Sequence, residues 1–236
     1  GVQYVPLDFR YLSVACFVLF AYAASTWALS DDLQRHERVT IVPFPALYTA
    51  AVSLFYFLLP ESIVSRVVIL ILFGVGMYAL FLTANIFSVA KGRTIQLVHA
   101  ANAVSGLFGV LISLLLANTI FSLRLPFFVN GLLVGLAHFP LTFTLLWSTR
   151  LENKIEQDSI SFSLILSLIL AELAVILSFF PLGIWYYALF IMSVFYMGFG
   201  LLQSYMRSRL FFRTLFEYSL VAAFIAIVFI LVVPIK

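Results

Sequence analysis

The sequence has 236 residues, of which 64% are hydrophobic and only 10% are charged. A water-soluble domain of this length could not bury so much apolar surface, because globular chains are about 45–50% apolar and about 25% charged. The net charge of +3 is too small to indicate nucleic-acid binding, so nucleic acid is not an expected partner. The composition predicts an all-α, polytopic transmembrane helical bundle that forms a single domain over residues 1–236.

The apolar runs are long enough for about eight membrane spans, at about 20 residues for each crossing. Prolines mark several boundaries, because proline cannot continue a helix, and the turn at Pro181 separates the sixth span from the seventh. In chain order the predicted spans cover residues 11–29, 41–60, 67–90, 97–120, 126–148, 160–180, 183–203 and 214–235. An even number of spans places both termini on the same side of the membrane.

Lys and Arg are divided unevenly between the two sides. One side carries Arg35, Arg38, Lys91, Arg93, Arg150, Lys154, Arg207, Arg209 and Arg213, and the other carries Arg10, Arg66, Arg124 and Lys236. Because cytoplasmic loops are enriched in Lys and Arg, this bias predicts that the loops at 30–40, 91–96, 149–159 and 204–213 are cytoplasmic. We therefore expect an integral protein of the cytoplasmic membrane with both termini outside.

Residues at a shift of about half the chain resemble one another. Pro6 corresponds to Pro126, Trp27 to Trp147, and Pro60 nearly to Pro181. Such a pattern predicts two parallel four-helix halves, at residues 1–120 and 121–236, as found in duplicated transporters. The alternative is that proline and tryptophan simply mark helix ends.

Glu172 is the most informative single residue, because it lies near the middle of the predicted span at 160–180. A carboxylate at the centre of a span costs about 2.5–3.5 kcal/mol on insertion scales, so we expect Glu172 to face protein and to find a partner. Small residues at helical spacing predict a close helix contact beside it, at Ser163, Ser167, Ala171, Ala174 and Ser178. Glu172 is thus either an ion or proton site or a structural hydrogen-bonding group.

His138 lies near the middle of the fifth span and is the expected partner of Glu172 at the same depth. Gly131, Gly135, His138 and Thr142 share one helix face, and Pro140 leaves the carbonyl of Leu136 without its usual donor. A proton relay between His138 and Glu172 would use both groups. Asn130 and Thr142 of the same span complete this candidate pathway.

Further polar residues gather toward the predicted cytoplasmic ends of their spans. They are Asn85, His99, Asn102, Gln203 and Glu217. These residues could form a polar vestibule for an ion pathway. The structural alternative is that polar groups near an interface reach water cheaply, and Glu217 follows Arg213 at the spacing of a helical ion pair.

The loop that contains Arg207, Arg209 and Arg213 mixes basic and aromatic residues beside the membrane. This pattern is typical of contacts with anionic lipid headgroups, at about 1 kcal/mol for each charge. The alternative is that the three arginines only set topology. An association with a second copy or with another membrane protein is also open.

No cofactor or metal site is predicted. A retinal protein needs a lysine inside the bundle, whereas Lys91 and Lys154 lie in predicted loops and Lys236 is the last residue. His99 and His138 lie at different depths, which argues against paired haem ligands.

The segment His99–Gly106, together with His138 on the next span, faintly resembles the rhomboid proteases, in which an intramembrane serine pairs with a histidine of another helix. The resemblance implies an intramembrane hydrolase that uses Ser105 and His138. Ala103 stands where the family's Gly-x-Ser-Gly motif has its first glycine, and the motif is on a different span from the family's. This resemblance covers less than a tenth of the chain.

Three functions therefore remain open. A small transporter or permeation-type protein predicts a continuous polar cavity that reaches Glu172. A noncatalytic scaffold or assembly subunit predicts a closed bundle in which Glu172 is satisfied locally. An intramembrane hydrolase predicts Ser105 within hydrogen-bond reach of His138.

Overall fold

A computed structural model describes residues 9–30, 37–90, 97–151, 156–209 and 211–232. Over these residues the chain is all-helical, and eight helical segments are long and apolar enough to cross a membrane, as predicted. The helices are α1 (Arg10–Ala28), α2 (Glu37–Thr40), α3 (Pro43–Tyr56), α4 (Ile63–Val89), α5 (Leu97–Ser122), α6 (Phe127–Arg150), α7 (Gln157–Leu177), α8 (Ile184–Met206) and α9 (Phe212–Val232). The second span is formed by α2 and α3 together.

The helix boundaries follow the proline signals of the sequence. Pro126 is the N-cap of α6, and the chain turns at Pro181 between α7 and α8, as predicted. The second span differs from the prediction, because helix already begins at Glu37, in the predicted loop. Pro43 and Pro45 have no backbone N–H, so the helix cannot run unbroken through them and divides into α2 and α3.

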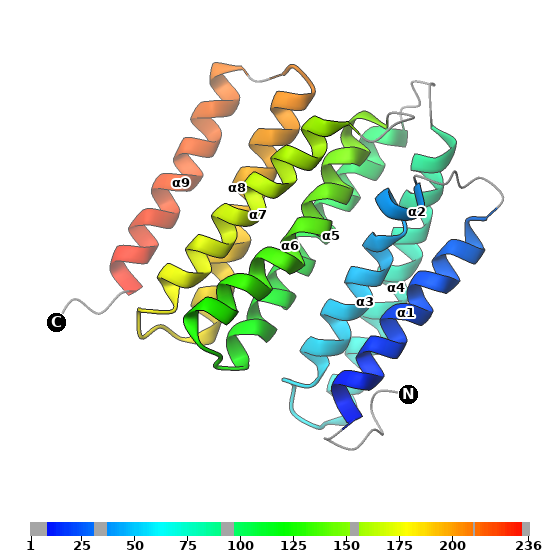
Figure 1. The fold of residues 1–236 in the computed structure, drawn as a ribbon, viewed down its shortest axis with the longest axis horizontal. Helices are drawn as coiled ribbons and strands as arrows, with labels where there is room; N and C mark the ends of the chain where they lie inside the picture. The colour runs from blue at the N-terminus through cyan, green and yellow to red at the C-terminus, as the bar shows by residue number, and fades with distance from the viewer. Residues whose placement is uncertain (1–8, 31–36, 91–96, 152–155, 210, 233–236) are drawn as a thin grey trace.

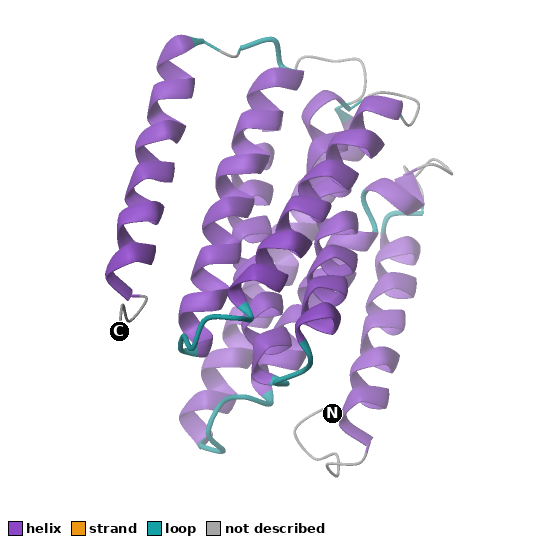
Figure 2. Cartoon of the chain, turned by 60° about the vertical axis from the view of Figure 1, so that its left-hand side comes forward, coloured by secondary structure: helices purple, strands orange, loops and turns teal. Residues whose placement is uncertain are grey.

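Two helices, α5 and α6, occupy the middle of the bundle (Figure 1). On one side α3 and α4 pack against α5, and α1 packs on α3. On the other side α6 packs closely against α7, and α5 packs against α8. Figure 2 shows the same bundle after rotation, with α9 at its edge. Consequently α5 and α6, together with the span of α2 and α3, have the largest buried share among the described spans, at 56% of the most apolar window of each.

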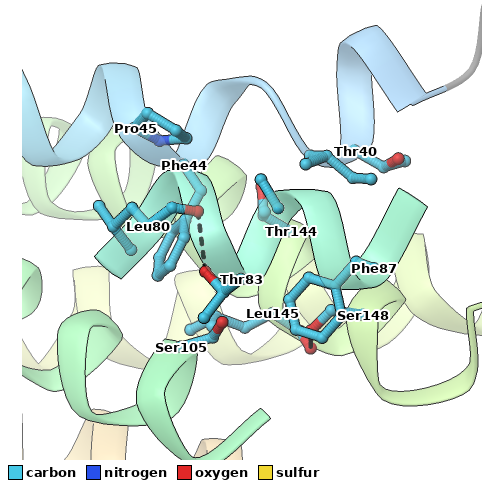
Figure 3. Close-up of a pocket in the computed structure, with 12 residues that line it drawn as sticks. Thr40, Phe44, Pro45, Leu80, Thr83, Phe87, Ser105, Thr144, Leu145 and Ser148 are labelled. Carbon is cyan, nitrogen blue, oxygen red and sulfur yellow. Dashed lines mark hydrogen bonds between the residues drawn. The ribbon is translucent and has the colours of Figure 1, made fainter. Parts of the chain in front are cut away.

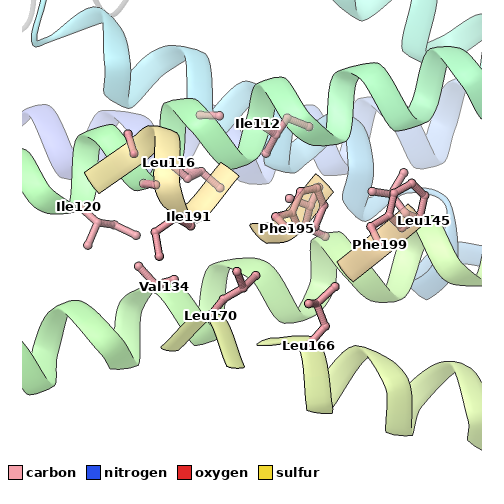
Figure 4. Close-up of a cluster of buried hydrophobic side chains, with 14 of the residues drawn as sticks. Ile112, Leu116, Ile120, Val134, Leu145, Leu166, Leu170, Ile191, Phe195 and Phe199 are labelled. Atoms are coloured by element: carbon pink, nitrogen blue, oxygen red, sulfur yellow. The ribbon is translucent and has the colours of Figure 1, made fainter. Parts of the chain in front are cut away.

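The apolar core lies where α5, α6, α7 and α8 meet (Figure 4). Its centre includes Ile112, Leu116, Val134, Leu145, Leu170, Ile191 and Phe195. By contrast, α9 packs mainly against α8 and has no buried residue, although the hydroxyl of Tyr218 fits over Gly200. A groove of about 310 Å³ lined by apolar side chains separates α7 from α9 over α8.

Glycines of α6 let α7 approach closely. A Cβ atom at Gly131 would lie 2.5 Å from Cγ2 of Val175 and 3.0 Å from the carbonyl oxygen of Ala171. A Cβ atom at Gly135 would lie 3.2 Å from that of Ala171. The small-residue face predicted for the sixth span is therefore the face that contacts α6.

Several sequence predictions concern residues that the structure does not describe. Arg35, Lys91, Arg93, Lys154 and Lys236 carry part of the orientation argument and lie outside the described residues. The cytoplasmic side, the type of membrane and the duplication of the two halves stay predictions.

Candidate functional site

His138 lies at the centre of the bundle. It is eleven residues after the start of α6 at Phe127, twelve before its end at Arg150, and fully buried. Its Nδ1 lies 2.8 Å from the carbonyl oxygen of Val134, and its Nε2 lies 2.8 Å from Oγ of Ser113 on α5. Because a carbonyl can only accept, Nδ1 carries the proton in the neutral ring, and the Ser113 hydroxyl donates to Nε2. Both ring nitrogens are thus satisfied.

The surroundings of His138 hold the ring in place. The rings of His138 and Phe195 on α8 pack in a T-shaped arrangement, with 5.6 Å between centroids. The hydroxyl of Thr142 donates to the carbonyl of His138 at 2.7 Å, one turn along a helix that contains Pro140. Thr142 therefore supports the backbone of His138.

The expected pair of His138 and Glu172 is wrong. Glu172 is exposed on the outer surface of α7, and no described residue bonds its carboxylate. The small-residue face of α7 faces α6, so Glu172 points away from the bundle. Glu172 also lies only five residues before the end of α7 at Leu177, closer to the membrane surface than the predicted span implied. The expectation that Glu172 faces protein is therefore wrong for the single chain.

The serine and histidine pairing expected of a hydrolase is also wrong, because the described partner of His138 is Ser113. Ser105 lies two turns away on α5, is 1% exposed, and its hydroxyl has no hydrogen-bond partner among the described residues. Ser105 lines a cavity of about 10 Å³ between α2, α3, α4, α5 and α6 (Figure 3). That volume corresponds to about one water molecule.

We call this space the hydroxyl cavity, because hydroxyl groups lie among its apolar walls. They belong to Thr40, Thr83, Ser105, Thr144 and Ser148. Thr83, Thr144 and Ser148 each donate at 2.8 Å to a carbonyl of their own helix. The single hydroxyl proton of each of these three residues is already used in a hydrogen bond, so each oxygen can only accept a further one. Ser105 is a hydroxyl of this cavity that still has a proton to donate.

The predicted polar vestibule is only partly present. Asn102 is buried, and its Oδ1 lies 3.5 Å from the hydroxyl of Ser148, whose proton is directed mainly at the closer carbonyl of Leu145, whereas Nδ2 of Asn102 has no partner within the described ranges. Asn85 and His99 are exposed. Glu217 is exposed and pairs with Arg213 at 3.2 Å, as the structural alternative predicted. Of these residues, Asn102 lies beside the hydroxyl cavity.

Asn130 lies in the first turn of α6, at the opposite end of the bundle. Its Nδ2 donates to the carbonyl of Leu125 and to the hydroxyl of Ser178, both at 3.2 Å. Its Oδ1 is buried, and no described group donates to it. Asn130 lines a space of about 690 Å³ between the α5–α6 and α7–α8 turns, which we call the Arg124 pocket after the only charged residue in its described lining.

Two further charged groups differ from the sequence interpretation. The sequence assigns Glu37 to a loop, yet this residue is fully buried at the start of α2. No hydropathy signal could have found this, since the residue lies in a polar stretch. At the C-cap of α8, burial and the nearby charge of Arg209 lower the pKa of the Arg207 guanidinium. A contact of Arg207, Arg209 and Arg213 with anionic lipid stays a prediction.

Polar groups thus follow one another along the interface of the antiparallel helices α5 and α6. The series runs from Asn130 through His138 and Ser113 to Ser105, Ser148 and Asn102. Within the described ranges, no group of three or more His, Cys, Asp or Glu residues could hold a metal ion. Hydrogen bonds join two pairs of this series across the interface, His138 with Ser113 and Asn102 with Ser148, and these groups can donate and accept protons locally.

Comparison with known proteins gives a family and no activity. The model of a family described as "Protein of unknown function (DUF5656)" matches residues 4–233. No curated protein and no solved structure matches the chain.

Proposed function

The chain belongs to the DUF5656 family, whose function is unknown, and we propose that this membrane-spanning chain is a small proton-coupled transporter or permeation-type protein whose path follows the α5–α6 interface. The observation that supports this proposal is the hydrogen-bonded pair of His138 and Ser113 at mid-depth. Ionisable side chains inside a membrane bundle are costly and commonly belong to proton or substrate pathways.

The pair can change its hydrogen-bond direction. In the neutral ring, Ser113 donates to Nε2, but a protonated ring would donate from both nitrogens and Ser113 would have to accept. The Ser113 hydroxyl can rotate to do so, because a hydroxyl both donates and accepts. His138 can therefore take up a proton from the side of Ser113 without a change of neighbours.

The two cavities lie at opposite ends of this interface. The Arg124 pocket contacts Asn130 near the start of α6, and the hydroxyl cavity contacts Ser148 near its end. Neither cavity is lined by His138, so the described conformation is closed around the central pair. Transport then requires α5 and α6 to separate on one side at a time, as alternating access does.

The test is proton flux into liposomes that contain the purified chain and a trapped pH-sensitive dye. A potassium gradient with valinomycin supplies the driving potential. We expect flux above that of empty liposomes, and we expect His138→Asn to lose most of it. His99→Asn is the matched control, because His99 is exposed near the start of α5, and it should conduct like the unmodified chain.

The proposal fails if the unmodified chain gives no flux above empty liposomes, or if His138→Asn conducts as well as His99→Asn. Thermal unfolding of His138→Asn in detergent must accompany the flux measurement. If His138→Asn unfolds at a lower temperature than the unmodified chain, lost structure accounts for its lost flux. Ser113→Thr, which keeps the hydroxyl, then serves as the second variant.

A noncatalytic assembly subunit is the second candidate, and the observation that favours it is Glu172. A carboxylate on an otherwise apolar helix face is costly in lipid, so a partner in the membrane would cover it. Under this function Glu172→Leu should weaken a complex, whereas His138→Asn should not. An intramembrane hydrolase built on Ser105 and His138 is not proposed, because Nε2 of His138 is hydrogen-bonded to Ser113 instead.

A further inference from the structure

The Arg124 pocket has the size of a ligand site. Its volume of about 690 Å³ lies within the range of about 300–1,000 Å³ that is usual for small-molecule pockets. It is formed by the two turns at one end of the bundle, between α5 and α6 and between α7 and α8. The transport proposal places this pocket at one end of its path and assigns it no ligand, and the inference below does not rest on that proposal.

Backbone amides without a hydrogen-bond partner lie at the pocket. The first two amides of α6 and of α8 have no partner among the described residues, whereas the next two bond to the carbonyls of Pro126 and Gly183, and Phe127 and Ile184, the first residues of these helices, line the pocket. The carbonyls at the ends of α5 and α7 already accept from the turns that follow, as at Phe121 and Leu177. Tyr187 donates to the carbonyl of Phe180 in the same way. A ligand that accepts hydrogen bonds would complete this set.

The charge of the pocket also favours a ligand that accepts hydrogen bonds. Arg124 is exposed, forms no ion pair with a described residue, and is the only charged residue of the described lining. A guanidinium offers five N–H donors in a planar fork that matches the oxygens of phosphate. An anion with phosphate-like geometry therefore fits the pocket better than a cation or a neutral solute.

Asn130 favours a ligand that also donates a hydrogen bond, whereas Arg124 and the backbone amides favour one that accepts. Leu125 offers only a carbonyl, and the Ser178 hydroxyl already donates to Ala174, so both must receive protons from Nδ2 of Asn130. This fixes the orientation of the amide and leaves Oδ1 as a buried acceptor to which no described group donates. Oδ1 has almost no surface open to the pocket that Asn130 lines, so the amide must shift before a ligand hydroxyl supplies that donor.

Aromatic side chains form the rim. Phe127 and Phe179 are 46% and 68% exposed, and their ring centroids lie 5.1 Å apart. Trp185, at the start of α8, is 54% exposed at the same end of the bundle. Exposed aromatic residues at helix ends are typical of the membrane interface, at the level of lipid headgroups.

From these observations we infer that the Arg124 pocket binds the headgroup of an anionic, hydroxyl-bearing phospholipid, such as phosphatidylglycerol. The phosphate contacts Arg124 and the first amides of α6 and α8, and a glycerol hydroxyl donates to Asn130. The acyl chains leave past the aromatic rim into the bilayer.

The experiment compares lipids by the thermal unfolding of the purified full chain in detergent. Phosphatidylglycerol has both the phosphate and free hydroxyls, phosphatidic acid has the phosphate alone, and phosphatidylcholine has no net charge. We expect stabilisation in that order. Arg124→Gln should weaken the response to both anionic lipids by about tenfold in concentration. Asn130→Leu should make phosphatidylglycerol and phosphatidic acid equivalent.

Each variant is compared with itself across the three lipids, so a change in its basal stability does not affect the result. Arg10→Gln is the matched control, because Arg10 lies at the same end of the bundle, over the ring of Phe57, and does not line the pocket. It should respond to lipids as the unmodified chain does. A preference for phosphatidylglycerol that survives Arg124→Gln would overturn the inference.

A second arm distinguishes a lipid from a soluble source of the same chemistry. Glycerol 3-phosphate is added to the chain in detergent without lipid. A shift that needs both Arg124 and Asn130 would support the same headgroup site with a soluble ligand, and no shift together with a lipid response would support the lipid. Absence of an Arg124-dependent response in both arms overturns the site.

Discussion

Of the two helices α6 and α9, the more apolar one is the less buried. The mean hydropathy of the most apolar window is 1.6 in α6 and 2.5 in α9, yet 56% of the α6 window is buried and none of the α9 window is. In water the more apolar helix would be inside. In lipid, apolar side chains gain little from leaving the solvent, so small and polar residues decide which helix lies at the centre.

The contact faces account for the difference. Gly131 and Gly135 let α7 approach α6, and His138 finds a partner on α5, whereas α9 offers mostly large apolar side chains to its surroundings. Close packing and interhelical hydrogen bonds are thus concentrated around α6. Substitutions on α6 and on the outer surface should therefore have unequal effects.

The largest expected effect is at the contact of α6 with α7. Gly131→Leu places a side chain where a Cβ atom already meets Val175 and the Ala171 backbone, and we expect a loss of about 3 kcal/mol in unfolding free energy. Gly74→Leu on α4 is the control, because no described atom lies within 4 Å of its Cβ position. Unfolding in detergent measures both. Equal effects would mean that close approach does not order this bundle.

A smaller loss is expected from Ser113→Ala, which leaves Nε2 of His138 buried without a donor. We expect a cost of about 1–2 kcal/mol. Ser219→Ala on the exposed α9 removes a hydroxyl that bonds to its own helix, and it should be nearly neutral. Thermal unfolding curves of the two variants test the contrast between inside and outside directly. A neutral Ser113→Ala would show that the pair is not a structural link between α5 and α6.

The smallest effect is expected at Glu172, and its sign is opposite. Glu172→Leu removes a carboxylate from the lipid-facing side of α7, five residues from its end, and should stabilise the isolated chain by about 0.5–1 kcal/mol. Glu172→Gln should have an intermediate effect. A fall in melting temperature for Glu172→Leu would show that another group covers the carboxylate, and it would break the division into a polar inside and an apolar outside.

The sequence predicts the helices well because hydropathy and proline report directly on membrane spans. It also identifies Ser167 and Ala171 as part of a contact face, since small residues at helical spacing are typical of closely packed membrane helices. His138 and Ser113 each lie on a small, polar helix face that is visible in the sequence, and both lie near the middle of their helices. Their similar depth on antiparallel helices is the signal that could have paired them.

Glu172 shows where such reasoning ends. The rule that a membrane carboxylate faces protein conflicts here with the helical pattern of α7. At 3.6 residues per turn, Glu172 lies about 100–180° around the helix from the small residues of the contact face, so the pattern itself places it on the outer surface. Likewise, Oδ1 of Asn130 and the hydroxyl of Ser105 lack hydrogen-bond partners because of the bonds that their described neighbours make. Those bonds are visible only in the three-dimensional structure.

The peripheral position of α9 has a consequence for how the molecule is made. This helix leaves the ribosome after α1 to α8, and it contributes no buried residue to them. The packing of α5 to α8 therefore needs no buried residue of α9, and α9 docks on it through Ile225, Val228 and Phe229, with Tyr218 over Gly200. A chain stopped after Ser208 should therefore insert and assemble its centre, but without the α9 wall of the groove and without the ring contacts of Phe229 with Phe180 and Phe190.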